Sequence, residues 1–203
     1  MADPHRDYFN RLAPQWNGMA PREPRLMEFL GRFGMTGGDR VLDVGTGTGL
    51  TATAIAACVG GSGFVVAQDF AEAMLLEARK TPADHPIHFL CSDIHGLPVR
   101  SGSFDKILCF SAFPHFRDPA AALLEMHRVL RKNGKLLILH HCSHDQLNLF
   151  HSSLEGPVRN DRLPSPAEMS RLLQAAGFDV LSATEADDVY WVEGIKGYTA
   201  DTA

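Results

Sequence analysis

A short apolar segment followed by glycines at alternate positions constrains this chain most. Residues 40–44 (Arg-Val-Leu-Asp-Val) are mostly apolar and β-branched, which predicts a buried strand. Gly45, Gly47 and Gly49 come next, and residues 50–59 have the composition of a helix. Glycines at a strand-to-helix turn permit left-handed backbone and let a ligand approach the chain closely. The stretch therefore predicts a ligand-binding loop in an α/β fold.

The spacing of the glycines separates two kinds of nucleotide ligand. A dinucleotide loop has the pattern G-x-G-x-x-G, whereas this chain has G-x-G-x-G. Asp43 stands at the carboxyl end of the first strand, where a carboxylate repels a pyrophosphate and attracts a sulfonium or an ammonium group. Asp69 ends a second apolar strand, where an acid can accept hydrogen bonds from ribose hydroxyls. The spacing and Asp43 argue against a dehydrogenase.

Together with four further stretches, this loop resembles the class I S-adenosylmethionine-dependent methyltransferases. In chain order the stretches are residues 65–75, 91–98, 104–110 and 125–135, and the likeness covers roughly residues 8–197. The resemblance implies a Rossmann-like, doubly wound α/β fold. Its seven-stranded sheet would be mostly parallel, with one antiparallel strand from a C-terminal hairpin. The resemblance also implies S-adenosyl-L-methionine as cofactor and a small-molecule acceptor, as in quinone-type methyltransferases. The acceptor atom stays open between oxygen, nitrogen, sulfur and a metalloid.

The resemblance assigns the cofactor to residues from five parts of the chain. Asp69 would bind the ribose, Asp93 would accept a hydrogen bond from the exocyclic amine of adenine, and Ile94 would pack on the adenine ring. The full implied set is Tyr8, Phe9, Trp16, Asp43, Gly45, Thr46, Gly47, Gly49, Asp69, Phe70, Met74, Asp93, Ile94, Phe110 and Ser111.

The order of expected elements predicts a sheet covered on both faces. Strands are expected over residues 40–44, 64–68, 87–91, 104–110, 135–141, 178–184 and 189–196, and helices over 21–33, 50–59, 71–80, 118–131 and 166–176. Strands that alternate with helices favour parallel pairing, and ligands then bind beyond the carboxyl ends of the strands.

We expect one methyltransferase domain over residues 1–203. It would comprise an N-terminal helical lid (1–36), a cofactor-binding core (37–141) and an acceptor-site segment that ends in the hairpin (142–203). Residues 3–18 form a helix and a loop in this prediction, and Pro14 interrupts the helix. The aromatic side chains of this segment either pack on the core or, together with Asn10, close over the cofactor, and an aromatic ring suits a sulfonium cation.

The stretch 140–151 (His-His-Cys-Ser-His-Asp-Gln-Leu-Asn-Leu-Phe-His) has no counterpart elsewhere in the chain. Its imidazoles and its thiol are compatible with a soft-metal site, with general bases, with an anion-binding pocket or with ordinary polar lining. We assign no metal ligand, because the spacing fits no standard zinc motif. The catalytic candidates are His115, His140, His141 and His144, and at least two of the last three are expected to line a cavity with His115. The alternative function is a metal- or tetrapyrrole-binding protein on a methyltransferase fold.

Composition limits the binding partners and the cellular compartment that we expect for this chain. The chain has 203 residues, 45% hydrophobic content and a net charge of −5, so it has no basic footprint for nucleic acid. It has no apolar run long enough to insert in a membrane, and its start does not resemble a signal peptide. Four scattered cysteines predict reduced thiols in a cytoplasmic protein. We expect a monomer or a homodimer.

Overall fold

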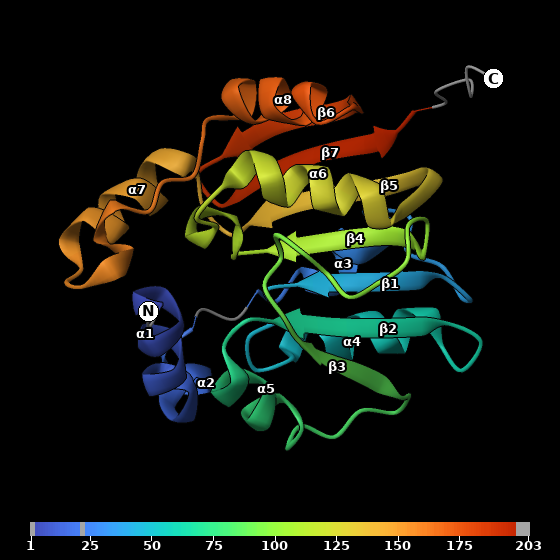
Figure 1. Ribbon diagram of the computed structural model, residues 1–203, viewed down its shortest axis with the longest axis horizontal. Coiled ribbons are helices and arrows are strands. Elements are labelled where there is room, and N and C mark those ends of the chain that lie inside the picture. The colour runs from blue at the N-terminus through green and yellow to red at the C-terminus, as the bar shows by residue number, and fades with distance from the viewer. Residues whose placement is uncertain (1–2, 21–22, 198–203) are drawn as a thin grey trace.

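The computed structural model describes residues 3–20 and 23–197. Within these residues the strands form one seven-stranded sheet in the order β3-β2-β1-β4-β5-β7-β6 (Figure 1). The strands are β1 (Arg40–Val44), β2 (Phe64–Asp69), β3 (Ile87–Cys91), β4 (Phe104–Phe110), β5 (Leu130–His140), β6 (Phe178–Ala186) and β7 (Val189–Lys196). The pairs from β3 to β5 are parallel, and β7 is antiparallel to both of its neighbours. The prediction of a mostly parallel sheet with an antiparallel hairpin strand is confirmed.

Helices cover both faces of the sheet, and further helices lie beyond one end of it. The helices are α1 (Pro4–Leu12), α2 (Trp16–Met19), α3 (Leu26–Arg32), α4 (Leu50–Val59), α5 (Glu72–Ala78), α6 (Pro119–Val129), α7 (His144–Ser153) and α8 (Pro166–Ala175). Helices α6 and α8 lie on one face and α3 and α4 on the other, while α1, α2 and α7 lie beyond the carboxyl ends of the parallel strands (Figure 1). No helix among the described residues is both long and apolar enough to cross a bilayer.

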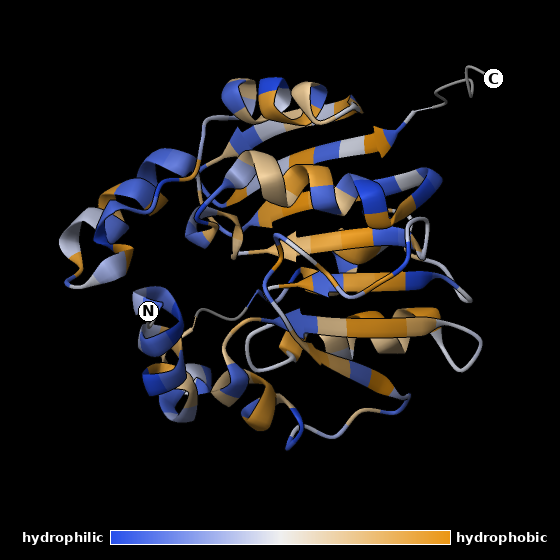
Figure 2. Cartoon of the chain, in the orientation of Figure 1, coloured by the Kyte–Doolittle hydropathy of each residue, from blue (hydrophilic) through white to orange (hydrophobic). Residues whose placement is uncertain are grey.

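The alternation of side chains along β5 explains why both faces are covered. Leu137 and Leu139 point to the face of α3 and α4, whereas Leu136 and Ile138 point to the face of α6 and α8. All four side chains are fully buried, and each contributes about 1.5–3 kcal/mol relative to an exposed position. The central strands are accordingly hydrophobic along most of their length (Figure 2).

Two helices begin where their sequence predicts. The Asp118 carboxylate accepts a hydrogen bond from the backbone N–H of Ala121 at 3.0 Å, and proline follows at the first helical position of α6. At the start of α8, Ser165 and Glu168 form a reciprocal capping box. Gly177 then takes a left-handed conformation with φ 90° and ends that helix.

The predicted boundary that differs most from the structure is the start of the fifth strand. β5 begins at Leu130 rather than at residue 135, because Leu130 pairs with Phe104 ahead of a register shift in β4, and α6 ends correspondingly early. The predicted interruption at Pro14 is observed, but a 3₁₀ turn over residues 13–15 and the short helix α2 follow α1 where a loop was expected. The predicted start of the third helix at Pro21 lies outside the described residues, and α3 is observed from Leu26.

The glycine loop after β1 packs against its neighbours without room for side chains. Gly45 has φ 66°, and a Cβ atom added there would lie 2.4 Å from Cβ of Ala112. Gly49 has φ 81°, and its added Cβ would lie 2.9 Å from Cβ of Ala78. The loops after β1 and β4 are therefore in direct backbone contact at the edge of the sheet.

We predict that Gly45→Ala lowers the free energy of unfolding by about 1–3 kcal/mol, because it combines left-handed strain with overpacking against Ala112. Urea unfolding measures the difference. Gly31→Ala in α3 is the matched control: nothing lies within 4 Å of its added Cβ, so its stability should be unchanged or higher. A Gly45→Ala protein as stable as wild type would contradict the packing described here.

Candidate active site

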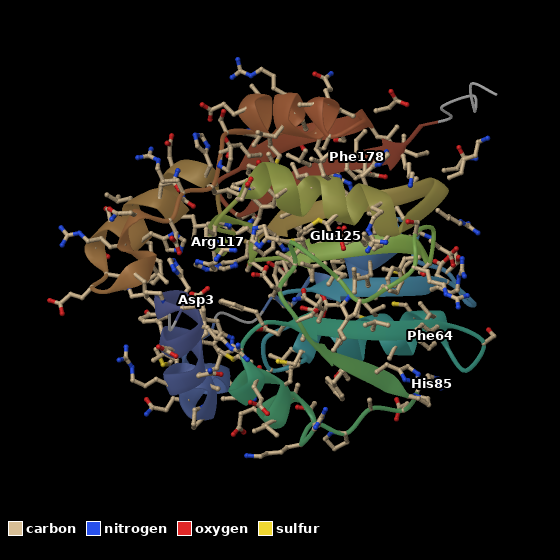
Figure 3. The ribbon with its side chains drawn as sticks, in the orientation of Figure 1. Asp3, Phe64, His85, Arg117, Glu125 and Phe178 are labelled. Atoms are coloured by element: carbon tan, nitrogen blue, oxygen red, sulfur yellow. The ribbon has the colours of Figure 1, made fainter. Side chains whose placement is uncertain are left out.

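A cavity of about 720 Å³ opens at the carboxyl ends of the parallel strands. The loops after β1, β2, β3 and β4 line it, together with α1, α2 and residues 160–162. Figure 3 labels Asp3 and Arg117, which both line this cavity, and places Phe64 and His85 at the opposite end of the sheet. The position agrees with the expectation that ligands bind beyond the carboxyl ends of parallel strands.

Backbone N–H groups hold the carboxylate of Asp69, and a hydroxyl holds that of Asp43. Asp69 at the end of β2 accepts hydrogen bonds from the N–H of Gly47 at 2.9 Å and of Ala71 at 2.8 Å. Asp43 at β1 accepts a hydrogen bond of 2.6 Å from the hydroxyl of Thr46. The left-handed turn at Gly45 and Gly47 thus brings the ends of β1 and β2 together.

Both carboxylates are buried, and burial shifts their protonation. Desolvation raises the pKa of Asp43 from its usual value to about 7, and it raises the pKa of Asp69 to about 6. Asp43 Oδ1 is buried and has no hydrogen-bond partner in the described chain. A ligand that brings positive charge to this edge of the sheet would favour the ionised form of both carboxylates.

The N-terminal helices cover the cavity with aromatic side chains. The buried ring of Phe9 makes edge contacts with Trp16, Phe70 and His115, at centroid distances of 5.7, 6.1 and 5.0 Å. Asn10 Oδ1 accepts a hydrogen bond of 2.9 Å from the backbone N–H of Ala73, in the first turn of α5. This bond replaces the side-chain cap that α5 lacks, because its N-cap residue is Ala71. The N-terminal segment is therefore attached to the loop after β2 by an apolar contact with Phe70 and to the first turn of α5 by a hydrogen bond from Ala73.

The loop after β3 supplies one exposed and one buried lining residue. The Asp93 side chain is half exposed, accepts hydrogen bonds from the backbone N–H and the imidazole of His95, and lies 3.6 Å from Arg117. Ile94 is buried, with 4% of its surface exposed. Gln68 fixes this loop through a 2.6 Å hydrogen bond from its amide to the carbonyl of Ser92.

Most residues that the sequence assigned to the cofactor lie together around the cavity, and three do not line it. Tyr8 packs beside Phe9 and near Gly156, Asp43 lies beneath the glycine loop, and Gly49 packs against Ala78. The predicted residues that line the cavity are Phe9, Trp16, Gly45, Thr46, Gly47, Asp69, Phe70, Met74, Asp93, Ile94, Phe110 and Ser111.

Two of the predicted histidines line the cavity, each with a polar partner. His115 Nδ1 lies 2.6 Å from the carboxylate of Asp161. His141 Nδ1 lies 3.3 Å from the hydroxyl of Ser111, a residue held at φ 54° at the end of β4. Burial lowers the pKa of His141, so its imidazole is neutral near pH 7 and can accept a proton.

The other two predicted histidines face away from the cavity, so the expectation that at least two of His140, His141 and His144 line it is wrong. His140 is fully buried against Tyr190, because the strand alternation of β5 turns it to the face of α6 and α8. Desolvation holds the pKa of His140 well below its usual value. His144 at the start of α7 contacts Glu185 at 2.8 Å instead.

The histidine-rich stretch holds a loop in place rather than grouping its imidazoles. Within residues 3–20 and 23–197, no three His, Cys, Asp or Glu side chains are arranged to hold a metal ion. In α7, Asn148 exchanges two hydrogen bonds with the backbone of Leu163, at 2.7 and 3.0 Å. His151 Nδ1 donates to the carbonyl of Asp161 at 2.9 Å. The side chains of Asn148 and His151 therefore bind backbone, whereas the imidazole of His144 contacts the carboxylate of Glu185.

Among the lining residues to which the sequence assigned no role, His5 and Asp161 stand out because they contact each other. His5 Nε2 lies 2.9 Å from the same Asp161 carboxylate that contacts His115. The residues are 156 and 46 positions apart along the chain, so no local pattern connects them. The only local signal for Asp161 was its position in the polar loop after α7.

Known proteins resemble this chain in sequence over most of its length. The family described as "Methyltransferase domain" matches residues 42–138. The chain is 30% identical over 165 residues to the O-methyltransferase rstn1 of Aspergillus nomiae, and the aligned region covers 77% of this chain and 72% of that protein. It is 31% identical over 156 residues to the ubiquinone/menaquinone biosynthesis C-methyltransferase UbiE of Geotalea uraniireducens, which covers 72% of this chain and 62% of that protein.

Solved structures resemble it in fold. A SAM-dependent methyltransferase from Aquifex aeolicus superposes with a TM-score of 0.71 at 25% identity, over 96% of this chain and 99% of that one. Several curated relatives are longer, and the chain spans 40% to 62% of the length of four of them.

The raised pKa of Asp43 predicts a pH-dependent stability. The folded chain keeps a proton on Asp43 up to about pH 7, whereas the unfolded chain releases it near the usual value of 3.8. The folded state therefore binds more protons in this window, and Asp43 lowers the free energy of unfolding as the pH rises through it. Asp43→Asn cannot ionise and so does not lose stability in this way. The free energy of unfolding of the variant, relative to that of wild type, should therefore rise by about 1–4 kcal/mol between pH 4 and pH 8.

Urea unfolding at several pH values measures this difference. Asp187→Asn, in the exposed turn between β6 and β7, is the control and should stay at a constant offset from wild type. An equally constant offset for Asp43→Asn would show that Asp43 ionises normally in the folded chain.

Proposed function

The chain belongs to the family of S-adenosylmethionine-dependent methyltransferases, and from this premise we propose that it transfers a methyl group to a small-molecule acceptor inside the cavity. The observation that carries the proposal is the meeting, in one cavity, of the glycine loop and Asp69 with an imidazole–carboxylate pair, His115 and Asp161. The first two suit the cofactor, and the pair suits proton removal from an acceptor.

The residues at the glycine-loop side of the cavity fit the cofactor of this family. Gly47 presents bare backbone to the cavity, and Asp69 beside it provides carboxylate oxygens for ribose hydroxyls. Phe70, Met74 and Ile94 supply apolar surface for a purine. Asp43 lies beneath the loop with an unpartnered Oδ1, and a cationic ligand would stabilise its ionised form.

The bound cofactor would supply a methyl group on a sulfonium, so the protein has to align the acceptor, exclude water and remove a proton where the acceptor carries one. Phe9 and Trp16 of the N-terminal segment cover the cavity and would exclude water as a lid. Asp161 holds Nδ1 of His115, which leaves Nε2 to accept the proton.

An acceptor with an ionisable ring hydroxyl suits this arrangement. A neutral imidazole can remove the proton of a phenol or a quinol, and the resulting anion is nucleophilic at oxygen and at the adjacent ring carbon. One base would therefore serve either O- or C-methylation, the two activities that the names of the relatives print. Aromatic lining from Phe110 and Phe116 gives a flat ring apolar contact.

The cofactor assignment predicts that the protein binds S-adenosylhomocysteine and ignores NAD in calorimetry. Asp69→Ala removes two charge-assisted hydrogen bonds to the ribose and should weaken binding by about 2–4 kcal/mol, roughly a 30- to 1,000-fold rise in Kd. Asp187→Asn serves as the control with unchanged affinity. Unchanged affinity in Asp69→Ala would rule out the ribose contact.

The base assignment predicts a different pattern for His115→Gln, which keeps a hydrogen bond to Asp161 but cannot take a proton. Release of S-adenosylhomocysteine with a panel of phenols, naphthols and quinols should fall about 10²- to 10⁴-fold, while the Kd for S-adenosylhomocysteine stays within about twofold. His88→Ala, on the exposed edge of β3, should change neither quantity. Full turnover in His115→Gln would show that His115 is not the base.

A further inference from the structure

The carboxylate of Asp161 is shared between two histidines from distant parts of the chain. Its Oδ2 lies 2.6 Å from His115 Nδ1, and its Oδ1 lies 2.9 Å from His5 Nε2. His115 belongs to the 3₁₀ turn after β4, and His5 lies in the first turn of α1. All three side chains line the cavity. One carboxylate therefore connects the N-terminal helix to the acceptor side of the site.

Hydrogen bonds that do not involve the Asp161 side chain hold the backbone around it. His151 holds the carbonyl of Asp161 at 2.9 Å, and the Asp161 N–H donates to the carbonyl of Val158 at 3.1 Å. Two residues on, Asn148 holds both backbone groups of Leu163. The carboxylate is thus presented to the cavity by a loop that α7 holds at Asp161 itself and at Leu163, and its side chain is only 11% exposed.

The contact with Asp161 selects one orientation and one tautomer of His115. An imidazole whose Nδ1 faces a carboxylate carries its proton there, and Nε2 keeps the lone pair. Within the described chain, Nε2 has no hydrogen-bond partner. The ring is flanked by Phe9 at 5.0 Å and His151 at 5.2 Å, which restricts its rotation.

Polar contacts attach both ends of α1 to the rest of the chain. Asn10, near the C-terminal end of this helix, is attached to the first turn of α5 through Ala73. His5, near its N-terminal end, is attached to the loop after α7 through Asp161. The helix therefore spans the cavity between two polar anchors, with Phe9 buried beneath it.

We propose that Asp161 is a positioning residue that couples two events: it orients His115 with Nε2 open to the cavity, and through His5 it holds the N-terminal helix closed over the same cavity. The proposal rests on the proposed function, in which His115 removes the acceptor proton. The residue makes no contact with the reacting atoms in this role. It makes the base and the lid depend on one group, so that the oriented base and the closed, water-poor cavity occur together.

The charge on Asp161 suits this role. Burial alone would raise its pKa, but hydrogen bonds from His115 and His5 outweigh burial and hold the pKa below its usual value. The carboxylate is therefore ionised at neutral pH and attracts both imidazoles. When either imidazole is removed, the remaining one still binds the carboxylate and no longer shares it. The effects of removing His5 and His115 should therefore not be additive.

The experiment uses ¹⁵N-labelled full-length protein with S-adenosylhomocysteine. Long-range ¹H–¹⁵N spectra report the tautomer of His115, and amide hydrogen exchange over residues 8–12 reports closure of α1. The variants are Asp161→Asn, His5→Ala and His5→Gln, with Asp187→Asn as the matched control. Circular dichroism and urea unfolding confirm that each variant is folded.

We expect Asp161→Asn to change both readouts: His115 loses its Nδ1–H preference, and exchange over residues 8–12 accelerates at least about tenfold. His5→Ala should accelerate exchange and leave the tautomer of His115 in place. His5→Gln, whose amide still donates to the carboxylate, should restore much of the protection. Turnover, once a phenolic acceptor is found, should fall in kcat more than in KM for Asp161→Asn.

Either of two results overturns the proposal. If folded Asp161→Asn matches the control in both readouts, Asp161 positions neither group. If it changes only one of them, or if His5→Gln behaves like His5→Ala, the coupling through one carboxylate is absent. Calorimetry on the wild-type sample separates this failure from that of the proposed function, because a protein that binds no S-adenosylhomocysteine contradicts the latter.

Discussion

The contact between Gly45 and Ala112 is the constraint on which the site depends. The loops after β1 and β4 leave neighbouring parallel strands, and they meet so closely that no side chain fits at Gly45. Gly45 takes a left-handed conformation at this contact, with φ 66°. The turn lets the N–H of Gly47 reach Asp69, while Asp43 is enclosed below the loop. A local steric limit therefore sets the positions of both carboxylates and leaves bare backbone facing the cavity.

The close packing of the loops also buries two carboxylates, which is electrostatically unfavourable. Asp43 and Asp69 are buried near each other and belong to none of the ion pairs found among the described residues, and the pKa of each is raised, mainly by desolvation. A chain selected only for stability would place an apolar or amide side chain at such a position. Imidazoles of His5, His115 and His141 also line the cavity. The site thus combines carboxylates that a cationic ligand would keep ionised with imidazoles that can accept a proton.

Local chemistry made much of the fold predictable. The bounds of β1, β3, β4 and α4 follow from apolar runs flanked by glycine or by polar residues, and the structure has them where the sequence predicts. The start of β5 was missed because Leu130 joins the strand by pairing with Phe104, a contact that no local pattern contains. The glycine loop and the residues after β2 and β3 were predictable for the same local reason. The pairing of Asp161 with His5 and His115 depends on the tertiary fold.

The histidine-rich stretch illustrates why residue type alone misleads. Four imidazoles within twelve residues suggest one cluster with one purpose, but the chain geometry separates them. The period of β5 buries His140 on one face of the sheet, the end of the strand turns His141 into the cavity, and α7 carries His144 and His151 in other directions. In His151 and Asn148 the polar atoms bind backbone rather than ligand. Their effect on the site is indirect but specific, because the loop they hold carries Asp161. A run of polar residues after a buried strand can therefore be needed for function while only one of them faces the ligand.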